Sequence, residues 1–151
     1  MHFSMVQRVL GVLLMIFSLS MLPPVLVGLY FGDGAILPFL EGFLWLFVLG
    51  FLAFWPVRHL KHELKLRDGF VVVVMFWTVL GATGALPFYL ADRPDMSLTD
   101  AVFEAISGLT TTGATVLTGI DELPHSILFY RQELQWLGGM GIVVLAVAIL
   151  P

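Results

Sequence analysis

The chain of 151 residues is 59% hydrophobic and only 12% charged, with a mean hydropathy of +0.98 and a formal net charge of −4 at pH 7. This composition lies far from that of soluble globular domains and argues against a purely soluble protein. Cysteine is absent, which excludes a disulfide framework and a thiolate metal site, and no basic cluster mixed with aromatic residues indicates a nucleic-acid partner.

Four segments are long and apolar enough to cross a membrane. Each supplies about 20 apolar-dominated residues, enough for a hydrocarbon core roughly 30 Å thick. They are residues 5–31, 35–55, 70–90 and 128–150. Four spans leave no room for a soluble domain, and the first apolar run is longer than the hydrophobic region of a cleaved signal peptide.

The basic residues predict the orientation of these spans. Four of the chain's seven lysine and arginine residues fall in one short loop after the second span, namely Arg58, Lys61, Lys65 and Arg67. The positive-inside rule places this loop in the cytoplasm, and the N-terminus with it. Acidic loop residues then gather on the outer side: Asp33, Asp92, Asp95, Asp121 and Glu122.

Proline and glycine residues predict how two of the spans are shaped. The first span contains Pro23 and Pro24. Because proline removes an amide donor and clashes with the preceding turn, we expect a kink there. The alternative is a helix that ends near Leu22 and is followed by an interfacial segment. In the third span, Gly81 and Gly84 are expected to allow close contact between helices.

Residues 97–110 are too few for another span, since a helix of this length rises only about 21 Å. They nevertheless begin as a helix does. Ser97 opens a capping pattern, and Asp100 and Glu104 suit the positive N-terminal end. A capped, half-length helix that enters from outside and ends at a Thr-Thr-Thr-Gly run is typical of a pore helix, whose negative end points toward an ion path.

The run from Ser107 to Thr115, SGLTTTGAT, is polar and interrupted by glycine. Within a membrane, irregular backbone is tolerated only where protein buries it or a water-filled path runs beside it. Selectivity filters are such a case, because carbonyl oxygens from several loops replace the water around a dehydrated cation. Gly113 can adopt the positive φ that successive inward-facing carbonyls require. We therefore expect an all-α integral membrane protein with four transmembrane helices, a re-entrant pore helix and a selectivity-filter loop.

The last span carries ionisable residues in its first turns. Such groups are costly inside a span and usually have a partner. Glu104, about one turn down the pore helix, has an expected depth similar to that of Arg131, so the two could pair and support the filter from behind. Glu133 and Gln135 are rival partners, and exposure at the headgroup boundary is the alternative. The glycines at 138, 139 and 141 are typical of close packing or of a bend.

The filter run and the following LPHSILFYRQELQWLGGMGIVVLAVAILP resemble the first pore repeat of Trk-type potassium uptake proteins, the TrkH/TrkG group of the Trk/Ktr/HKT superfamily. The earlier segment LKLRDGFVVVVMFWTVLGATGALPF is similar to the same group. The resemblance covers essentially the whole chain. It implies that residues 1–67 form an N-terminal transmembrane helix pair with a basic cytoplasmic loop, and that residues 68–151 form the first pore repeat of helix, pore helix, filter and helix.

The resemblance also implies a function and a site. Thr111 and Thr112 would supply carbonyl ligands to potassium, and Thr110 and Gly113 would complete this quadrant of the filter. The implied function is potassium ion uptake across the bacterial inner membrane, without enzymatic activity. The implied partners are a second copy in a homodimer, membrane lipid and a TrkA-type nucleotide-binding regulatory subunit. Because the group has four filter segments and this chain has one, we expect the N-terminal portion of a longer protein rather than an assembly of four copies.

Two other functions stay open. A secondary transporter segment would bind its substrate at a broken helix near mid-membrane, and would have its polar break inside a full-length span. A membrane scaffold subunit without transport activity would not explain the Thr-Thr-Thr-Gly loop. The half-length helix before that loop favours the potassium pore over both.

Overall fold

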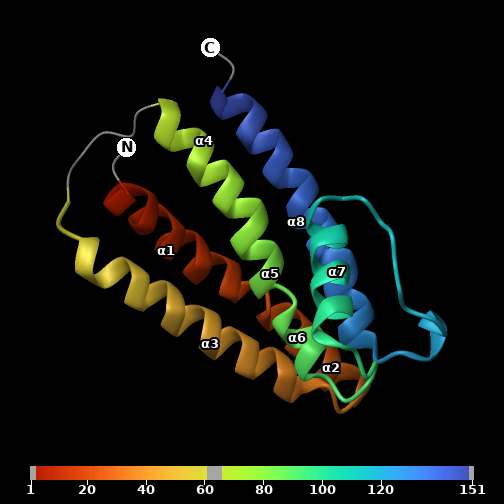
Figure 1. The fold of residues 1–151 in the computed structure, drawn as a ribbon. Helices are drawn as coiled ribbons and strands as arrows, with labels where there is room; N and C mark the ends of the chain where they lie inside the picture. Colours follow the sequence, from red (N-terminus) through yellow and green to blue (C-terminus); the bar gives the residue numbers. More distant parts are fainter. Residues whose placement is uncertain (1–2, 61–65, 150–151) are drawn as a thin grey trace.

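The computed structural model describes residues 3–60 and 66–149 (Figure 1). The regular structure of these residues is helical and contains no strand, which confirms the all-α expectation. Three helical stretches are long and apolar enough to cross a membrane: Phe3–Phe31, Ile36–Val57 and Asp68–Leu90. The helix α8 (His125–Ile149) follows where the fourth span is expected. Its 25 residues rise about 37 Å, and its role as a span stays a prediction.

The first long stretch is interrupted. It consists of α1 (Phe3–Leu19) and α2 (Leu22–Phe31), with a turn at residues 20–21. Pro23 and Pro24 lie in the first turn of α2, where a missing amide hydrogen removes no helical hydrogen bond. The sequence predicts a kink at these prolines, and the structure has a turn immediately before them.

Glycine residues bring α1 and α3 (Ile36–Phe54) into backbone contact. A Cβ atom on Gly11 would lie 2.8 Å from the carbonyl oxygen of Gly50, and a Cβ atom on Gly50 would lie 2.8 Å from that of Gly11. Small residues allow this approach, which is how membrane helices pack without a large apolar driving force between them. The helix α3 continues into a short 3-10 turn, η1 (Trp55–Val57).

The third stretch is built from four short pieces: α4 (Leu66–Met75), the π-helical turn η2 (Phe76–Leu80), α5 (Gly81–Thr83) and α6 (Leu86–Leu90). Its glycines make the close contacts that the sequence predicts. A Cβ atom on Gly81 would lie 2.9 Å from Cγ1 of Ile106, and one on Gly84 would lie 3.2 Å from Cζ of Phe17.

The helix α7 (Leu98–Leu109) is the expected half-length helix. Its N-cap is Ser97, whose hydroxyl oxygen accepts a hydrogen bond from the amide of Asp100 at 3.1 Å. In Figure 1, α7 lies against the first half of α8, and the loop that follows α7 arcs away from the bundle before it returns to α8. A 3-10 turn, η3 (Ile120–Glu122), lies in that loop.

Tyr130 connects α8 to the rest of the bundle. Its side chain is fully buried. Its ring packs edge-on against Phe39 at a centroid distance of 5.3 Å and in a tilted arrangement against Phe88 at 5.1 Å. Its hydroxyl donates a hydrogen bond of 2.8 Å to the carbonyl oxygen of Gly84, between α5 and α6. The start of α8 is thus held against both the N-terminal helices and the third stretch.

Asp33, in the loop after α2, caps α8 from a distance of 93 residues along the chain. Its carboxylate accepts hydrogen bonds from the amide of Ser126 at 2.8 Å and from the amide of Ala35 at 3.0 Å. Burial alone would raise the pKa of the Asp33 carboxyl, but these hydrogen bonds and the nearby His125 outweigh it and hold the pKa below its usual value.

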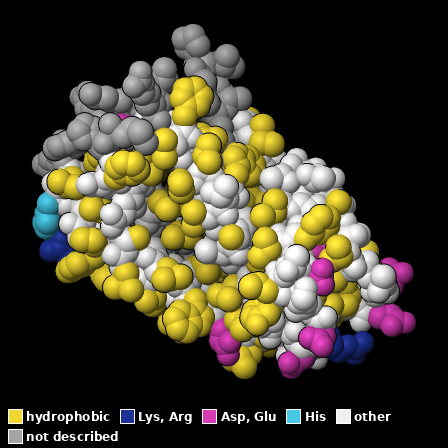
Figure 2. Space-filling view, viewed as in Figure 1, with side chains coloured by type: hydrophobic (Ala, Val, Ile, Leu, Met, Phe, Trp, Pro, Cys, Tyr) yellow, Lys and Arg dark blue, Asp and Glu magenta, His cyan; other side chains and the backbone are white. Residues whose placement is uncertain are grey.

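Acidic side chains gather at one end of the bundle. Figure 2 shows a face covered largely by hydrophobic side chains, with most Asp and Glu side chains at one end. The loops at that end line a cavity of about 650 Å³, whose ionisable lining residues are Asp33, Glu41, Asp92, Arg93, Asp121, Glu122 and His125.

In the basic loop, Lys61 and Lys65 lie outside the described residues, so the orientation of the spans stays a prediction.

Candidate cation filter

The loop after α7 begins with an unusual backbone. Thr111 has a φ of 57° and Gly113 has a φ of 75°. Glycine adopts such angles readily, as expected for Gly113. A β-branched residue does not, and a threonine in this conformation costs about 1–3 kcal/mol. Thr111 is the only non-glycine residue with positive φ in the described part of the chain, so the strain is concentrated in the Thr-Thr-Thr-Gly run.

The amide groups of this run are all bonded back to the end of α7. The amide of Thr110 donates to the carbonyl of Ile106 at 2.8 Å, and that of Thr111 to the carbonyl of Gly108 at 2.9 Å. The amides of Thr112 and Gly113 both donate to the carbonyl of Ser107, at 2.9 and 3.3 Å. Every main-chain donor from 110 to 113 is therefore satisfied by the pore-helix candidate.

The carbonyl groups of the same run have no such partners. Among residues 3–60 and 66–149, no hydrogen bond is accepted by the carbonyl oxygen of Thr110, Thr111, Thr112 or Gly113. Residues 111–113 are exposed, and Thr110 is half-buried at the end of α7. The loop therefore keeps its donors occupied and leaves four successive carbonyl oxygens available, which is the arrangement that a dehydrated cation needs.

Side-chain hydroxyls hold the loop to the helix. The buried Ser107 donates its hydroxyl to the carbonyl of Ala114 at 2.7 Å, so one residue of α7 contacts both sides of the run. The hydroxyl of Thr110 donates to the carbonyl of Ile106 at 2.7 Å and lies 2.8 Å from the hydroxyl of Thr112. Ser107 was not singled out from the sequence, where it is only the first letter of the filter run.

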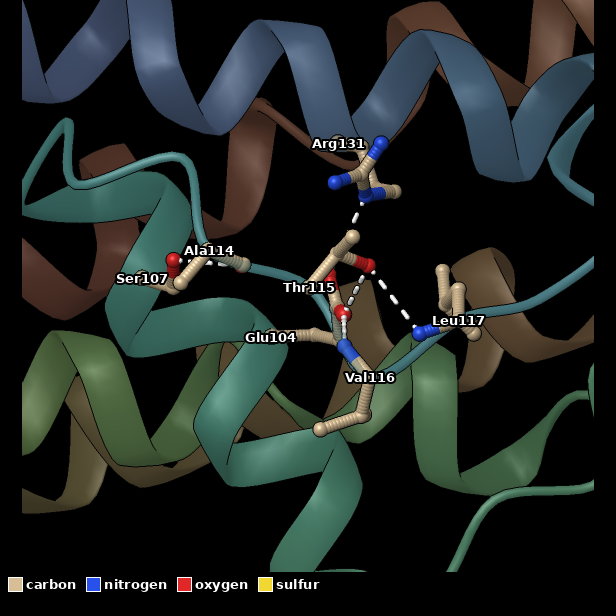
Figure 3. Close-up of polar contacts among 7 residues, drawn as sticks. All are labelled: Glu104, Ser107, Ala114, Thr115, Val116, Leu117 and Arg131. Atoms are coloured by element: carbon tan, nitrogen blue, oxygen red, sulfur yellow. Dashed lines mark hydrogen bonds and ion pairs between the residues drawn. The ribbon is translucent and has the colours of Figure 1, made fainter.

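Glu104 binds the part of the loop that follows the Thr-Thr-Thr-Gly run (Figure 3). This residue of α7 is almost completely buried. Its Oε1 atom accepts hydrogen bonds from the amide of Val116 at 2.7 Å and from the hydroxyl of Thr115. The hydroxyl of Thr115 accepts in turn from the amide of Leu117 at 3.0 Å. Carboxylates accept such bonds strongly, so the segment 115–117 is tied to the middle of α7.

The structure brings Glu104 and Arg131 together. Nε of Arg131, on α8, donates to Oε2 of Glu104 at 3.1 Å, and the two side chains are 10% and 1% exposed. The rival partners Glu133 and Gln135 make no hydrogen bond to Arg131 within the described residues. One carboxylate therefore joins α7, the loop and α8.

The glycines of α8 lie against the end of α7. A Cβ atom on Gly138 would lie only 1.8 Å from the carbonyl oxygen of Leu109, the residue before the Thr-Thr-Thr-Gly run. A Cβ atom on Gly139, by contrast, would make an ordinary contact of 3.8 Å with Cγ2 of Thr111. Close packing, one of the two roles expected for this cluster, is thus found at Gly138.

Known proteins and a solved structure resemble this chain over its whole length. The family model TrkH, described as a cation transport protein, matches residues 36–151. The Trk system potassium uptake protein TrkH of Vibrio parahaemolyticus is 60% identical over 151 residues, which are 100% of this chain and 31% of that protein. TrkH of Escherichia coli K12 is 56% identical over the same share of each chain. The crystal structure of the potassium transporter TrkH from Vibrio parahaemolyticus matches with a TM-score of 0.95 and 60% identity, over 100% of this chain and 32% of that one. The chain thus spans about a third of the length of these relatives.

Proposed function

The chain belongs to the TrkH family of cation transport proteins, and we propose that it supplies one quadrant of the selectivity filter of a potassium uptake protein. Potassium is the transported ion in this proposal rather than a resident cofactor. Because the matched relatives are about three times as long, the other quadrants come from the remainder of a longer chain.

The proposal rests on how the main-chain amides of residues 110–113 differ from the main-chain carbonyls of the same residues. All four amides are bonded to the end of α7, and none of the four carbonyl oxygens accepts a hydrogen bond among the described residues. Thr111 and Thr112 supply carbonyl ligands to potassium, and Thr110 and Gly113 complete the quadrant. The negative end of the α7 dipole lies next to these oxygens and favours a cation there.

In this proposal α7 is a re-entrant pore helix and α8 is the fourth span. The 12 residues of α7 rise about 18 Å, too little for a hydrocarbon core of about 30 Å. The N-terminus and the basic loop after α3 face the cytoplasm, and the acidic end faces outward. Residues 1–67 form the preceding helix pair, and residues 68–151 form the pore repeat.

Glu104 and Arg131 support the filter without contacting the ion. The carboxylate holds the amide of Val116 and the hydroxyl of Thr115, and the guanidinium fixes that carboxylate to α8. Pairing with Arg131 limits the cost of burying both charges.

We further propose, from the family resemblance, that the full-length protein acts as a homodimer in the bacterial inner membrane with a TrkA-type regulatory subunit. The printed names assign the relatives to a Trk system. Potassium and sodium fluxes into vesicles that contain the full-length protein test the function. We expect potassium flux that exceeds sodium flux. Flux that requires a co-transported substrate would support a secondary transporter, and the absence of flux would support a scaffold subunit.

A further inference from the structure

Arg131 uses only one of its three nitrogen atoms in the contacts described above. Nε donates to Glu104, whereas neither terminal nitrogen makes a hydrogen bond to any residue within 3–60 or 66–149. In Figure 3 the dashed line that leaves Arg131 starts at Nε, and none starts at a terminal nitrogen. A guanidinium carries five N–H donors in one plane, so four of them lack an acceptor in this part of the protein.

The four N–H donors without an acceptor belong to the Arg131 side chain, which is only 10% exposed. Donors that lose water without gaining an acceptor are destabilising, so an arginine this deep is normally hydrogen-bonded at both ends. Glu104 does not take them, because Nε is the only Arg131 nitrogen within hydrogen-bond distance of that carboxylate. The missing acceptors must therefore come from water or from protein outside the described residues.

Charge decides which kind of acceptor fits. The Glu104–Arg131 pair is already neutral as a unit, so a second buried carboxylate would leave an uncompensated negative charge. Main-chain carbonyl oxygens accept from a guanidinium without changing the net charge. Such a group could approach from the exposed side of the site. Residues 111–116 of the loop are exposed there, and so are Gln132 and Trp136 of α8.

We propose that Arg131 joins two quadrants of the filter. Nε holds Glu104 of its own repeat, and the two terminal nitrogens donate to main-chain carbonyls of the loop beside the filter in the neighbouring repeat of the full-length chain. The occupant of the open side is thus a segment of the same polypeptide. This inference rests on the proposed function, because it requires that a second filter segment lies beside this one.

Arg131→Lys in the full-length protein separates the two roles of this side chain. Lysine keeps the positive charge and can still reach Glu104, but it lacks the planar pair of terminal nitrogens. We expect this variant to lower the ratio of potassium to sodium flux by at least about fivefold, the effect of losing one of the two hydrogen bonds that the terminal nitrogens make. Arg93→Lys, in an exposed loop, is the matched control and should leave the ratio unchanged.

The outcomes are distinct. A wild-type flux ratio in Arg131→Lys, together with a reduced ratio in Glu104→Gln, would mean that only the pair within the repeat matters, and would overturn the inference. Absence of potassium-selective flux in the wild-type protein would instead contradict the proposed function. If Arg131→Lys does not fold, a structure of the wild-type full-length protein decides. A carbonyl of another repeat within about 3.2 Å of a terminal nitrogen supports the inference, and water or a carboxylate there overturns it.

Discussion

Glu104 on α7 and Arg131 on α8 form a buried ion pair, with Oε2 and Nε 3.1 Å apart. The other oxygen of the same carboxylate holds the loop after the Thr-Thr-Thr-Gly run. The helix α7, the strained loop and the predicted fourth span, α8, therefore meet at one side chain. This junction holds the segment of the loop that directly follows the candidate ligands.

A double-mutant cycle on Glu104→Gln and Arg131→Gln tests the pair energetically. Removal of one partner leaves the other charge buried and unpaired, so each single variant should lower the free energy of unfolding by about 3–5 kcal/mol. The double variant should lose much less than the sum, because it leaves no uncompensated charge. Denaturation of the full-length protein in detergent, with potassium uptake measured alongside, provides the data. Strictly additive effects would show that the two side chains do not interact.

Gly138→Ala should disturb the filter more than Gly139→Ala. The added Cβ atom would lie 1.8 Å from the carbonyl oxygen of Leu109 in the first case, but 3.8 Å from Cγ2 of Thr111 in the second. The first contact forces α8 and the end of α7 apart, and overpacking of this kind costs about 1–3 kcal/mol. We expect a lower thermal midpoint and a lower ratio of potassium to sodium flux for Gly138→Ala alone. Equal behaviour of the two variants would contradict the packing described for α7 and α8.

Gly113→Val should reduce selectivity for potassium over sodium. At a φ of 75° a valine is strained, so the loop must change its backbone and move the carbonyl oxygens. Gly119→Val is the matched control, since Gly119 has a φ of 61° in the same loop but outside the filter run, and nothing lies within 4 Å of an added Cβ atom at either position. Unchanged selectivity in Gly113→Val would remove the filter assignment.

Thr111→Ser makes a complementary test in the same assay. The proposed ligand at Thr111 is the main-chain carbonyl, and serine retains the hydroxyl, so the flux ratio should change little.

Asp33→Asn should lower stability at neutral pH by about 0.3–1 kcal/mol, because a neutral amide lacks the charge that interacts favourably with the positive N-terminal end of α8. The pKa of Asp33 is lowered in the folded protein, so its contribution is complete above its ordinary pKa and is lost as the pH falls through the lowered value. The difference in thermal midpoint between wild type and variant should therefore shrink below about pH 4. Asp92→Asn, in an exposed loop, is the control. A difference that stays constant down to pH 2 would rule out the carboxylate cap.

Local patterns in the sequence were sufficient for much of the fold. Apolar runs indicated the spans, Ser97 with Asp100 indicated the start of α7, and Gly113 indicated a positive φ, because each of these depends on neighbouring residues. The meeting of Glu104 with Arg131 could be anticipated from their similar depths alone. Depth is a reliable guide in a membrane protein, since the bilayer aligns elements that are distant in the chain.

The remaining features depend on contacts that no local pattern encodes. A threonine is a poor candidate for positive φ, and Thr111 adopts it only because the amides around it are held by α7. The cap that Asp33 provides to Ser126 spans 93 residues. The glycine cluster of α8 was visible, but only the crossing of two helices singles out Gly138.

The central claim is that the carbonyl oxygens of Thr111 and Thr112 bind the transported ion. Crystals of the full-length protein soaked in rubidium or thallium, heavier stand-ins for potassium, test it most directly. We predict anomalous density beside these two carbonyls, and a reduced peak there in Gly113→Val. Ordered ions elsewhere along the path, with none beside Thr111 and Thr112, would contradict the claim.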